Sequence, residues 1–393
     1  MVRIEKNMNK SQTENRTGVK EREIWLDILK ATAVSAVSFF HAGFPTFFLP
    51  MIILSAFIVA SGYVFKEQKL IDYLKKQFFR LWIPFVVANF LAVLLRNLLI
   101  SVGLWAGYPY KGKAVFMSVL RSFVFCFSDD LCSPHWFVFM IFTVGVFFYF
   151  LYYLCVFTER FLLGLKKGKT VENSIREGLV RDVLICVISV LMFIAGIVFN
   201  GPLNKFMWNN CAFVTNIFYA TILYSLGYIS KRYALIKKIL NLNLWVKIGV
   251  FILLSIVLSV LYLKGYIVDH RAGRFSNPIL VPGVAYMGFL WLMFVSKAVI
   301  EKLPTVVKSF ICYIGRNSLY IMLYHAMAYQ VVTFIQVKIC HIPYDPAWQW
   351  QNVYMGNGMW VTLAGLCGVI IPLAVPKLKS IIAKRFRKDG LSK

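Results

Sequence analysis

Acidic residues are scarce in this sequence. Its 393 residues include 17 Asp and Glu against 43 Lys and Arg, which gives a formal net charge of +26. Charged residues of either sign make up only 15% of the chain, whereas a soluble domain carries roughly 25%. Because 59% of the residues are hydrophobic, the chain has too little polar surface for a soluble protein of its length. The composition therefore excludes an ordinary soluble domain.

The excess of basic residues has two common explanations, a nucleic-acid partner or a membrane surface. Apolar runs of about 20 residues recur along the whole sequence, and each is long enough to cross the hydrocarbon core of a bilayer. We therefore expect a polytopic membrane protein and no nucleic-acid partner.

A cleavable signal peptide is not expected at the start of the sequence. Residues 1–22 are polar and basic, without an apolar stretch or a small-residue cleavage site. We expect them to form a disordered basic cytoplasmic tail. A transmembrane domain over residues 23–376 and a second basic cytoplasmic tail over residues 377–393 are expected to follow.

The apolar runs predict an all-α fold of about ten transmembrane helices. Turn signals separate them, such as the Asn-Gly-Pro run at 200–202 and Pro304. The predicted spans cover residues 25–43, 46–65, 81–102, 135–157, 180–199, 211–229, 243–264, 279–299, 312–336 and 358–376.

The distribution of Lys and Arg tests this number of spans independently of hydropathy. If the N-terminus is cytoplasmic and ten spans alternate, the cytoplasmic segments hold 32 of these residues and the external segments hold 8. Lys and Arg favour the cytoplasmic side of a membrane, and a missed or invented span would invert the bias in the second half. The charges therefore predict ten spans with both termini in the cytoplasm.

Carboxylates are absent from the middle of every predicted span. Transporters driven by protons or sodium ions depend on such groups to bind the coupling ion. The sequence therefore argues against an ion-coupled transporter.

The longest predicted external segment, residues 103–134, contains an apolar stretch at 114–127. This stretch suits either an amphipathic helix in the membrane interface or a lid over an external cavity.

The eight cysteines lie singly, without the spacing of a metal or haem site. Cys126 and Cys132 are the expected disulfide pair on the external side, where Cys211 and Cys340 also fall.

Lys30 and His41 lie on the first predicted span. Eleven residues separate them, which is about 16 Å and close to three turns of a helix, so both occupy nearly the same face. A cation near the inner surface and an imidazole in the outer half could bracket a long anionic substrate. Alternatively, Lys30 reaches the cytoplasmic headgroups and His41 is a hydrogen-bonded residue of the interface.

His325 falls about 13 residues into the ninth predicted span, near the middle of the membrane. It follows a predicted helix start, where Asn317 or Ser318 could cap free N–H groups. A helix N-terminus beside Arg316 would also attract phosphate at the cytoplasmic surface. Equally, the segment is an ordinary cap followed by a histidine whose hydrogen bonds are satisfied.

His135 is a further intramembrane candidate, with an ordinary interfacial role as its alternative, whereas His270 and His341 are expected to have no part in chemistry. His135 precedes Trp136 at a predicted interface, where such a pair is typical of an aromatic belt. His270 and His341 fall in predicted external loops.

Five motifs, in order along the chain, resemble those of the membrane-bound acyltransferase 3 family. The first is a basic residue, ten further residues and then a histidine, which Lys30 and His41 fit. The resemblance covers the whole chain, and a ten-helix protein agrees with it. The other motifs are residues 61–63 (SGY), 80–84 (RLWIP), 135–137 (HWF) and 315–325 (GRNSLYIMLYH).

The resemblance implies the transfer of an acyl group, usually acetyl from acetyl-CoA, to hydroxyls of envelope polysaccharides, glycolipids or related acceptors. By this resemblance His41 is the catalytic histidine, and Lys30 is a basic partner near the donor. His325 belongs to the late motif and is expected to join them at the catalytic site. Arg80 is then a motif arginine near the CoA entrance.

One position departs from the family pattern in the expected donor loop. Many members carry an arginine three residues before Arg80, where this chain has Gln77. Lys75 and Lys76 could supply the missing charge. We expect CoA contacts from Lys76, Arg80, Arg316, Asn317 and Ser318 on the cytoplasmic side, because CoA is anionic.

The expected function is that of a plasma-membrane O-acyltransferase that takes an acyl group from cytoplasmic acyl-CoA, without a metal. Its partners would be acyl-CoA, an extracytoplasmic glycan or glycolipid, and membrane lipids. The alternative is a transporter or flippase for a polysaccharide precursor or small solute, which would move its substrate without acyl-CoA. A non-catalytic subunit of a glycan-assembly complex is a third possibility.

Overall fold

The computed structural model describes residues 23–102, 108–125, 129, 131, 135–163, 175–208, 211–341 and 358–390. The predicted N-terminal tail, residues 1–22, lies outside the described residues. So do Cys126 and Cys132, the expected disulfide pair.

The described part of the chain is almost entirely helical, which confirms the predicted all-α membrane fold. Within it, nine helices are long and apolar enough to cross a membrane, and a tenth apolar helix of 15 residues is shorter. The protein is therefore a multi-pass membrane protein. The first half contains α2 (Ile24–His41), α3 (Leu49–Tyr63), α4 (Leu70–Gln77), the π-helix η1 (Phe78–Trp82), α5 (Ile83–Ser101), α6 (Lys113–Ser122), α7 (Trp136–Leu162), α8 (Ile175–Val198) and α9 (Asn200–Leu203).

The second half adds the remaining membrane helices and one short hairpin. In that hairpin Val268 pairs with Phe275 and Asp269 with Arg274, in antiparallel register. The elements are α10 (Phe213–Arg232), α11 (Leu235–Leu240), α12 (Leu244–Leu263), β1 (Val268–Asp269), β2 (Arg274–Phe275), η3 (Pro278–Leu280), α13 (Val281–Lys302), α14 (Thr305–Arg316), α15 (Ser318–Cys340), α16 (Gly358–Ile370), η4 (Ile371–Leu373) and α17 (Ala374–Gly390).

Several predicted boundaries are wrong because amphipathic segments extend the apolar helices. The third span begins at Leu70, since α4, η1 and α5 form one continuous helical rod. The segment from 312 was assigned to the ninth span, but it belongs to α14, a separate amphipathic helix that ends at Arg316. At the C-terminal end α17 continues as helix to Gly390, through most of the segment predicted as a tail.

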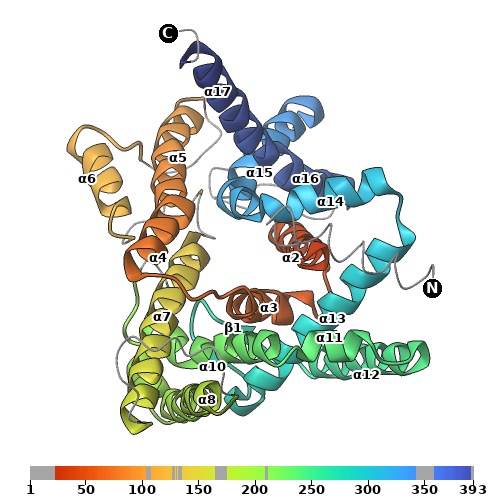
Figure 1. Cartoon of the computed structure of the whole chain (residues 1–393). Coiled ribbons are helices and arrows are strands. Elements are labelled where there is room, and N and C mark those ends of the chain that lie inside the picture. The colour runs from red at the N-terminus through yellow and green to blue at the C-terminus, as the bar shows by residue number, and fades with distance from the viewer. Residues whose placement is uncertain are drawn as a thin grey trace.

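Helices α2 and α3 form the centre of the bundle (Figure 1). Helix α2 contacts α3, α13, α14, α15 and α16, and α3 also contacts α10. In the apolar segment of α2, 61% of the residues are buried inside the protein, whereas in that of α12 only 11% are. Helix α2 is therefore central and α12 is peripheral. Helix α6 also lies at the periphery, beside α5 (Figure 1). Residues on α2 and α3 are thus the ones best placed to line an internal site.

Two glycines allow α3 and α10 to approach each other closely. A Cβ atom on Gly62 would collide with the carbonyl oxygen of Tyr224, and one on Gly227 would collide with that of Val59. Only glycine fits at such a backbone contact. This contact fixes the separation of α3 and α10.

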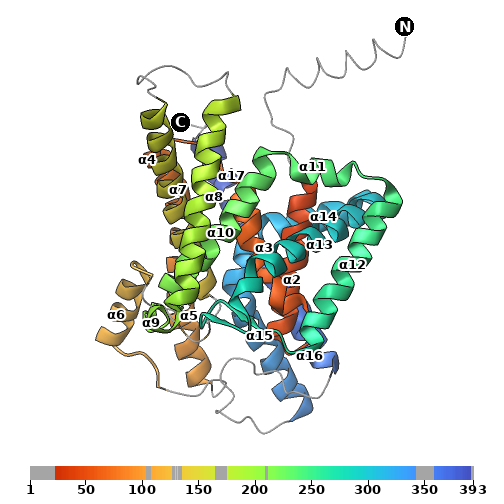
Figure 2. The same cartoon turned by 90° about the horizontal axis from the view of Figure 1, so that it is seen from below.

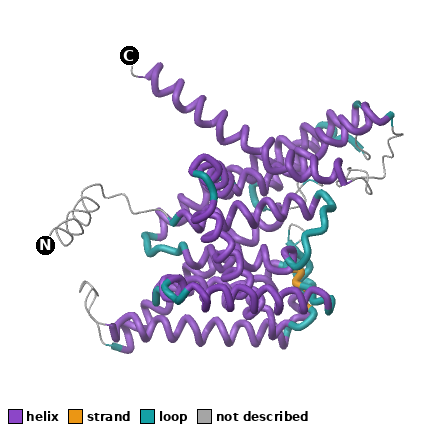
Figure 3. The backbone as a smooth tube through the Cα atoms, turned by 90° about the vertical axis from the view of Figure 1, so that its right-hand side faces the viewer, coloured by secondary structure: helices purple, strands orange, loops and turns teal. Residues whose placement is uncertain are grey.

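The bundle has two opposite faces. The start of α2 and helix α17 lie at one face, which we call the terminal face (Figure 2). The β1–β2 hairpin lies at the opposite face, which we call the hairpin face, as Figure 3 shows. Helix α2 runs from the terminal face to the hairpin face, so Lys30 lies nearer the former and His41 at the latter.

Candidate functional site

Two cavities penetrate the bundle from its two faces. The terminal-face cavity is narrow, about 150 Å³ in volume, and is lined by residues of α2, α3, α4, η1, α7, α10 and α15 and of the α3–α4 loop. The hairpin-face cavity is about 390 Å³ and is lined by α2, α3, α7, α12 and the segment through β1. Each predicted catalytic or donor residue can be placed relative to these two spaces.

The terminal-face cavity is strongly basic. Lys30, Lys66, Lys76 and Arg80 line it, and none of its lining residues is an acid. Asp27, one turn before Lys30, lies 4.0 Å from the Lys30 ammonium group and is not part of the lining. A cavity with four cations and no lining carboxylate favours an anionic ligand.

A π-helical turn presents Arg80 to this cavity. Residues Phe78–Trp82 form η1 between α4 and α5, and π-helical turns occur often at functional sites. Lys76 and Gln77 precede it, so the α4–η1 segment directs three polar side chains into the same space. The motif residue Gln77 therefore occupies the position where an arginine was expected, and Lys76 supplies a charge beside it.

Of the three predicted CoA-binding residues in the late motif, only Ser318 lines the terminal-face cavity. Ser318, the first residue of α15, lines the terminal-face cavity. Arg316 and Asn317 do not line it: the Arg316 guanidinium donates to the carbonyl of Cys312, and the Asn317 side chain donates to the carbonyl of Tyr313. Asn317 is the N-cap residue of α15, but its side chain makes no capping hydrogen bond.

His41 lies at the hairpin-face cavity, as the last residue of α2. The surrounding wall is mainly apolar and aromatic, and the side chains of Asp269 and Arg271 add the two charges of its lining. Phe47 is 67% exposed and its ring lies 6.1 Å from that of Tyr262, so an aromatic rim borders the space. A mainly apolar cavity with a few polar groups is typical of a small-molecule site.

His41 and His325 meet across the bundle. Their ring centroids are 5.4 Å apart, although 284 residues separate them in sequence. The Nδ1–H of His325 donates to the carbonyls of Ile321 and Met322, at 2.9 and 3.1 Å. These bonds hold the ring in one orientation and, in the neutral form of the imidazole, make Nε2 the acceptor nitrogen. Nε2 is buried and has no hydrogen-bond partner among the described residues.

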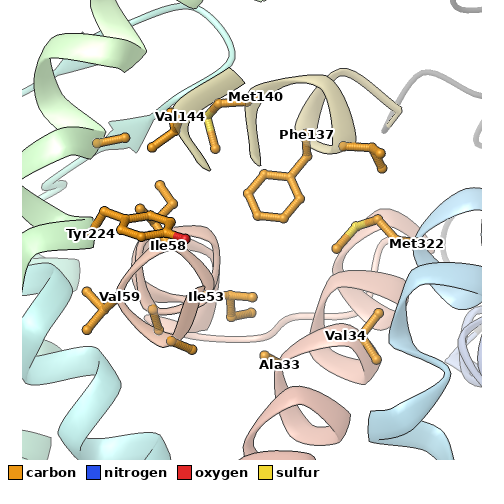
Figure 4. Close-up of a cluster of buried hydrophobic side chains, with 14 of the residues drawn as sticks. Ala33, Val34, Ile53, Ile58, Val59, Phe137, Met140, Val144, Tyr224 and Met322 are labelled. Atoms are coloured by element: carbon orange, nitrogen blue, oxygen red, sulfur yellow. The ribbon is translucent and has the colours of Figure 1, made fainter. Parts of the chain in front are cut away.

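A thin apolar layer separates the two cavities. On α3, Leu54 lines the hairpin-face cavity and Phe57 the terminal-face cavity, a difference of about 4.5 Å along a helix. Figure 4 shows Ile53, Phe137 and Met322 converging from α3, α7 and α15 on this layer. Met322 precedes His325 by about one turn. His41, at the hairpin-face cavity, therefore lies beyond this layer from the terminal-face cavity.

His135 has a structural role in the bundle. Its Nε2–H donates to the carbonyl of Leu323 at 2.7 Å, and its Nδ1 accepts from the side chain of Asn89 at 3.2 Å. It is completely buried and connects α5 to α15 near His325. The predicted location of His135 in an aromatic belt is thus wrong, because the side chain is buried between α5 and α15.

His270 is the residue that sequence reasoning missed. The sequence predicts an external loop without a part in chemistry, but His270 is buried in the wall of the hairpin-face cavity. Its Nδ1–H donates to Asn216 at 3.0 Å and its Nε2 accepts from Ser55 at 2.8 Å. Burial lowers the pKa of His270 to about 4, with a smaller opposing effect from Asp269. No local pattern predicts this location, because it depends on the hairpin folding back over α3.

Other predicted features lie away from the two cavities. Helix α6 forms within the expected apolar stretch, but none of its residues lines the hairpin-face cavity, which favours the interfacial helix over the lid.

Cys211 and Cys340 are free thiols, and burial raises the pKa of Cys211 to about 12. Among the described residues, no group of three His, Cys, Asp or Glu side chains is arranged to hold a metal ion. His341 is exposed at the end of α15.

Comparison with protein-family models gives a match over nearly the whole chain. The acyltransferase 3 family model, described as an acyltransferase domain, matches residues 23–377. No curated protein and no solved structure matches the chain. The matched region includes both cavities and both histidines of the pair.

Proposed function

Because the chain belongs to the acyltransferase 3 family and is a multi-pass membrane protein, we propose that it transfers an acetyl group from cytoplasmic acetyl-CoA to an envelope acceptor. The acceptor is a hydroxyl of a polysaccharide, a glycolipid or a related molecule outside the cytoplasm. The protein is thus a membrane acyltransferase, and the donor, the acceptor and the roles of individual residues are our proposal.

The observation that supports this proposal is the approach of two cavities, from opposite faces, to one histidine pair. Acyl transfer across a membrane needs a donor site on one side, an acceptor site on the other and a catalytic group between them. The basic cavity at the terminal face suits the phosphates of CoA, and the aromatic cavity at the hairpin face suits a sugar ring. His41 lines the second cavity, and its partner His325 follows Met322, which lines the first, by about one helical turn.

In the donor site, Lys30, Lys76 and Arg80 would bind the anionic groups of CoA. The narrow volume of this cavity suits the extended pantetheine arm, with the nucleotide nearer the surface. Ser318 also lines this cavity and provides a neutral hydrogen-bonding group. The thioester would then reach the apolar layer formed by Ile53, Phe137 and Met322.

Chemistry would take place at His41. The neutral imidazole takes the proton of the acceptor hydroxyl as the oxygen attacks the thioester carbon. The carbon–sulfur bond then breaks, and the imidazolium returns its proton to the leaving CoA thiolate. A second route, in which His41 carries the acyl group before passing it to the acceptor, uses the same geometry.

His325 would support His41 through its fixed acceptor nitrogen. The two backbone carbonyls bind Nδ1–H of His325 and leave Nε2 available. Nε2 is buried and has no hydrogen-bond partner among the described residues. It can accept a proton or stabilise positive charge that develops on His41. This role requires no carboxylate in the membrane.

The orientation in the membrane follows from the charge bias. We propose that the terminal face is cytoplasmic, with both terminal segments, residues 1–22 and 377–393, on that side. The hairpin face would then be extracytoplasmic, at the plasma membrane.

The test is the acetylation of envelope glycans in cells that make His41→Ala. We expect a complete loss of the acetyl mass increment in mass spectra of the glycans, with the protein present at its normal level. The matched control is His341→Ala, which removes an exposed histidine outside both cavities and should retain full activity. Full acetylation by His41→Ala would refute the proposed chemistry, and solute movement without acyl-CoA in proteoliposomes would favour a transporter.

A further inference from the structure

The loop between α3 and α4 directs a basic side chain into the terminal-face cavity and an acidic side chain away from it. Val64, Phe65, Lys66 and Gln68 line this cavity, but Glu67 does not. Glu67 instead turns toward α7 and α8, where its carboxylate contacts Tyr152 and Arg181. A cation of the loop thus points into the cavity, while the only acid of the same loop points away.

Three tyrosine hydroxyls of α7 hold this loop, and we call Tyr149, Tyr152 and Tyr153 the tyrosine clamp. Tyr149 and Tyr153 both donate to the backbone carbonyl of Gln68, at 3.0 and 2.8 Å. Tyr152 donates to the carboxylate of Glu67. Two consecutive loop residues are therefore fixed by hydrogen bonds from one helix.

Arg181 supports the clamp from α8. Its guanidinium donates to the Tyr152 hydroxyl at 2.8 Å and lies 3.6 Å from the Glu67 carboxylate. It also pairs with Asp182 at 3.4 Å, and Asp182 in turn accepts from Arg232 at 3.0 Å. Arg181 is 7% exposed, so its orientation is set by these partners.

Aromatic packing holds the same loop from within. The ring of Phe65 lies 5.2 Å from Phe148 and 5.1 Å from Tyr152, with Tyr224 and Tyr228 slightly farther away. The hydrogen bonds therefore act on a loop that is already anchored, and they decide which way its polar groups point.

We propose that the tyrosine clamp and Arg181 are positioning residues that determine the affinity of the protein for its anionic donor. They hold Gln68 and Lys66 in the cavity wall, and they keep the negative charge of Glu67 out of the cavity. A released Glu67 would repel the phosphates of CoA at the cavity mouth. This inference rests on the proposed function, in which acyl-CoA binds in the terminal-face cavity.

The first test removes single hydroxyls. Tyr153→Phe keeps the ring and deletes one hydrogen bond to Gln68, whose loss has a typical effect of about 0.5–1.5 kcal/mol. We expect KM for acetyl-CoA to rise roughly 2- to 10-fold, with kcat unchanged. The matched control is Tyr313→Phe, because Tyr313 also donates to a backbone carbonyl, that of Leu373, but lies outside the cavity.

The second test separates the charge effect from a loss of structure. Arg181→Ala should raise KM for acetyl-CoA more than Tyr153→Phe does. Adding Glu67→Gln to Arg181→Ala should lower KM again, since the released side chain no longer carries a negative charge. A merely structural role for Arg181 would leave the double variant as impaired as the single one, or more so.

Calorimetric titration of the detergent-purified full chain with CoA makes the outcomes distinct. Wild-type binding that is weakened in Tyr153→Phe and Arg181→Ala, and restored in the double variant, supports the inference. Equal affinities in all variants would overturn the inference and leave the proposed function intact. If the wild-type protein does not bind CoA, the proposed donor is wrong, and this inference fails with it.

Discussion

The histidine pair shows how two distant residues acquire a joint role. Each ring is unremarkable in its own helix, but the distance of 5.4 Å between His41 and His325 places a fixed acceptor nitrogen beside the proposed catalytic imidazole. Both residues were predicted from their locations in the membrane and from the family motifs. The family resemblance implies that they share a site, but the distance and orientation of the two rings were not predictable, since no sequence spacing relates α2 to α15.

His270 gives a second result at the residue scale, because its protonation is linked to folding. Above pH 6.5 the imidazole is neutral in both the folded and the unfolded chain. Between pH 6.5 and about 4 the unfolded chain binds a proton that the folded protein does not, so stability decreases as the pH falls. The full loss is about 3 kcal/mol below pH 4.

We therefore expect the melting temperature of the purified protein in detergent to fall from pH 7 to pH 4.5. His270→Gln removes the titrating group, so part of this pH dependence should disappear in that variant. The carboxylates that also titrate in this range are common to both proteins. Identical pH profiles for the two proteins would show that the folded protein binds the proton at His270 as readily as the unfolded chain does.

At the scale of helices, the glycine contact between α3 and α10 determines the shape of the terminal-face cavity. Tyr224 of α10 and Ser61 of α3 both line this cavity, next to the contact. Any separation of the two helices would therefore widen the proposed donor site.

Gly62→Ala tests this contact. The added methyl group meets the Tyr224 backbone, which cannot rotate away, and overpacking of this kind typically costs about 1–3 kcal/mol. We expect a lower melting temperature and less monodisperse protein on size-exclusion chromatography in detergent. Gly249→Ala on α12 is the matched control: nothing lies within 4 Å of its added methyl group, and it should be as stable as the wild type or more stable. Equal behaviour of the two variants would contradict a tight α3–α10 contact.

Hydropathy and charge predicted the membrane helices better than they predicted the ends of those helices. Apolar runs of sufficient length have few alternatives to a membrane span, and the described residues contain nine such helices and one shorter apolar helix, α3. The boundaries near 81 and 312 were wrong because α4 and α14 carry charges on one face and apolar residues on the other. The π-helical turn at Arg80 and the burial of His270 depend on tertiary packing, and the sequence gives no signal for either.

At the scale of the whole molecule, the fold divides the proposed reaction between two sides of the membrane. Four cations face the terminal-face cavity, and an aromatic rim borders the hairpin-face cavity. The apolar layer around Ile53, Phe137 and Met322 lies between the two spaces. Such an arrangement would allow a thioester to reach His41 while the nucleotide stays on the donor side.

Inside-out membrane vesicles test this division of the reaction, because they enclose the native acceptors and expose the cytoplasmic face to the medium. Radiolabelled acetyl-CoA in the medium reaches only that face, since the molecule does not cross a bilayer. We predict labelled glycan or glycolipid inside vesicles that contain the wild-type protein, no label with His41→Ala, and no label when right-side-out vesicles receive the same donor. Label of equal intensity with His41→Ala, or label in right-side-out vesicles, would contradict transfer through the membrane at His41.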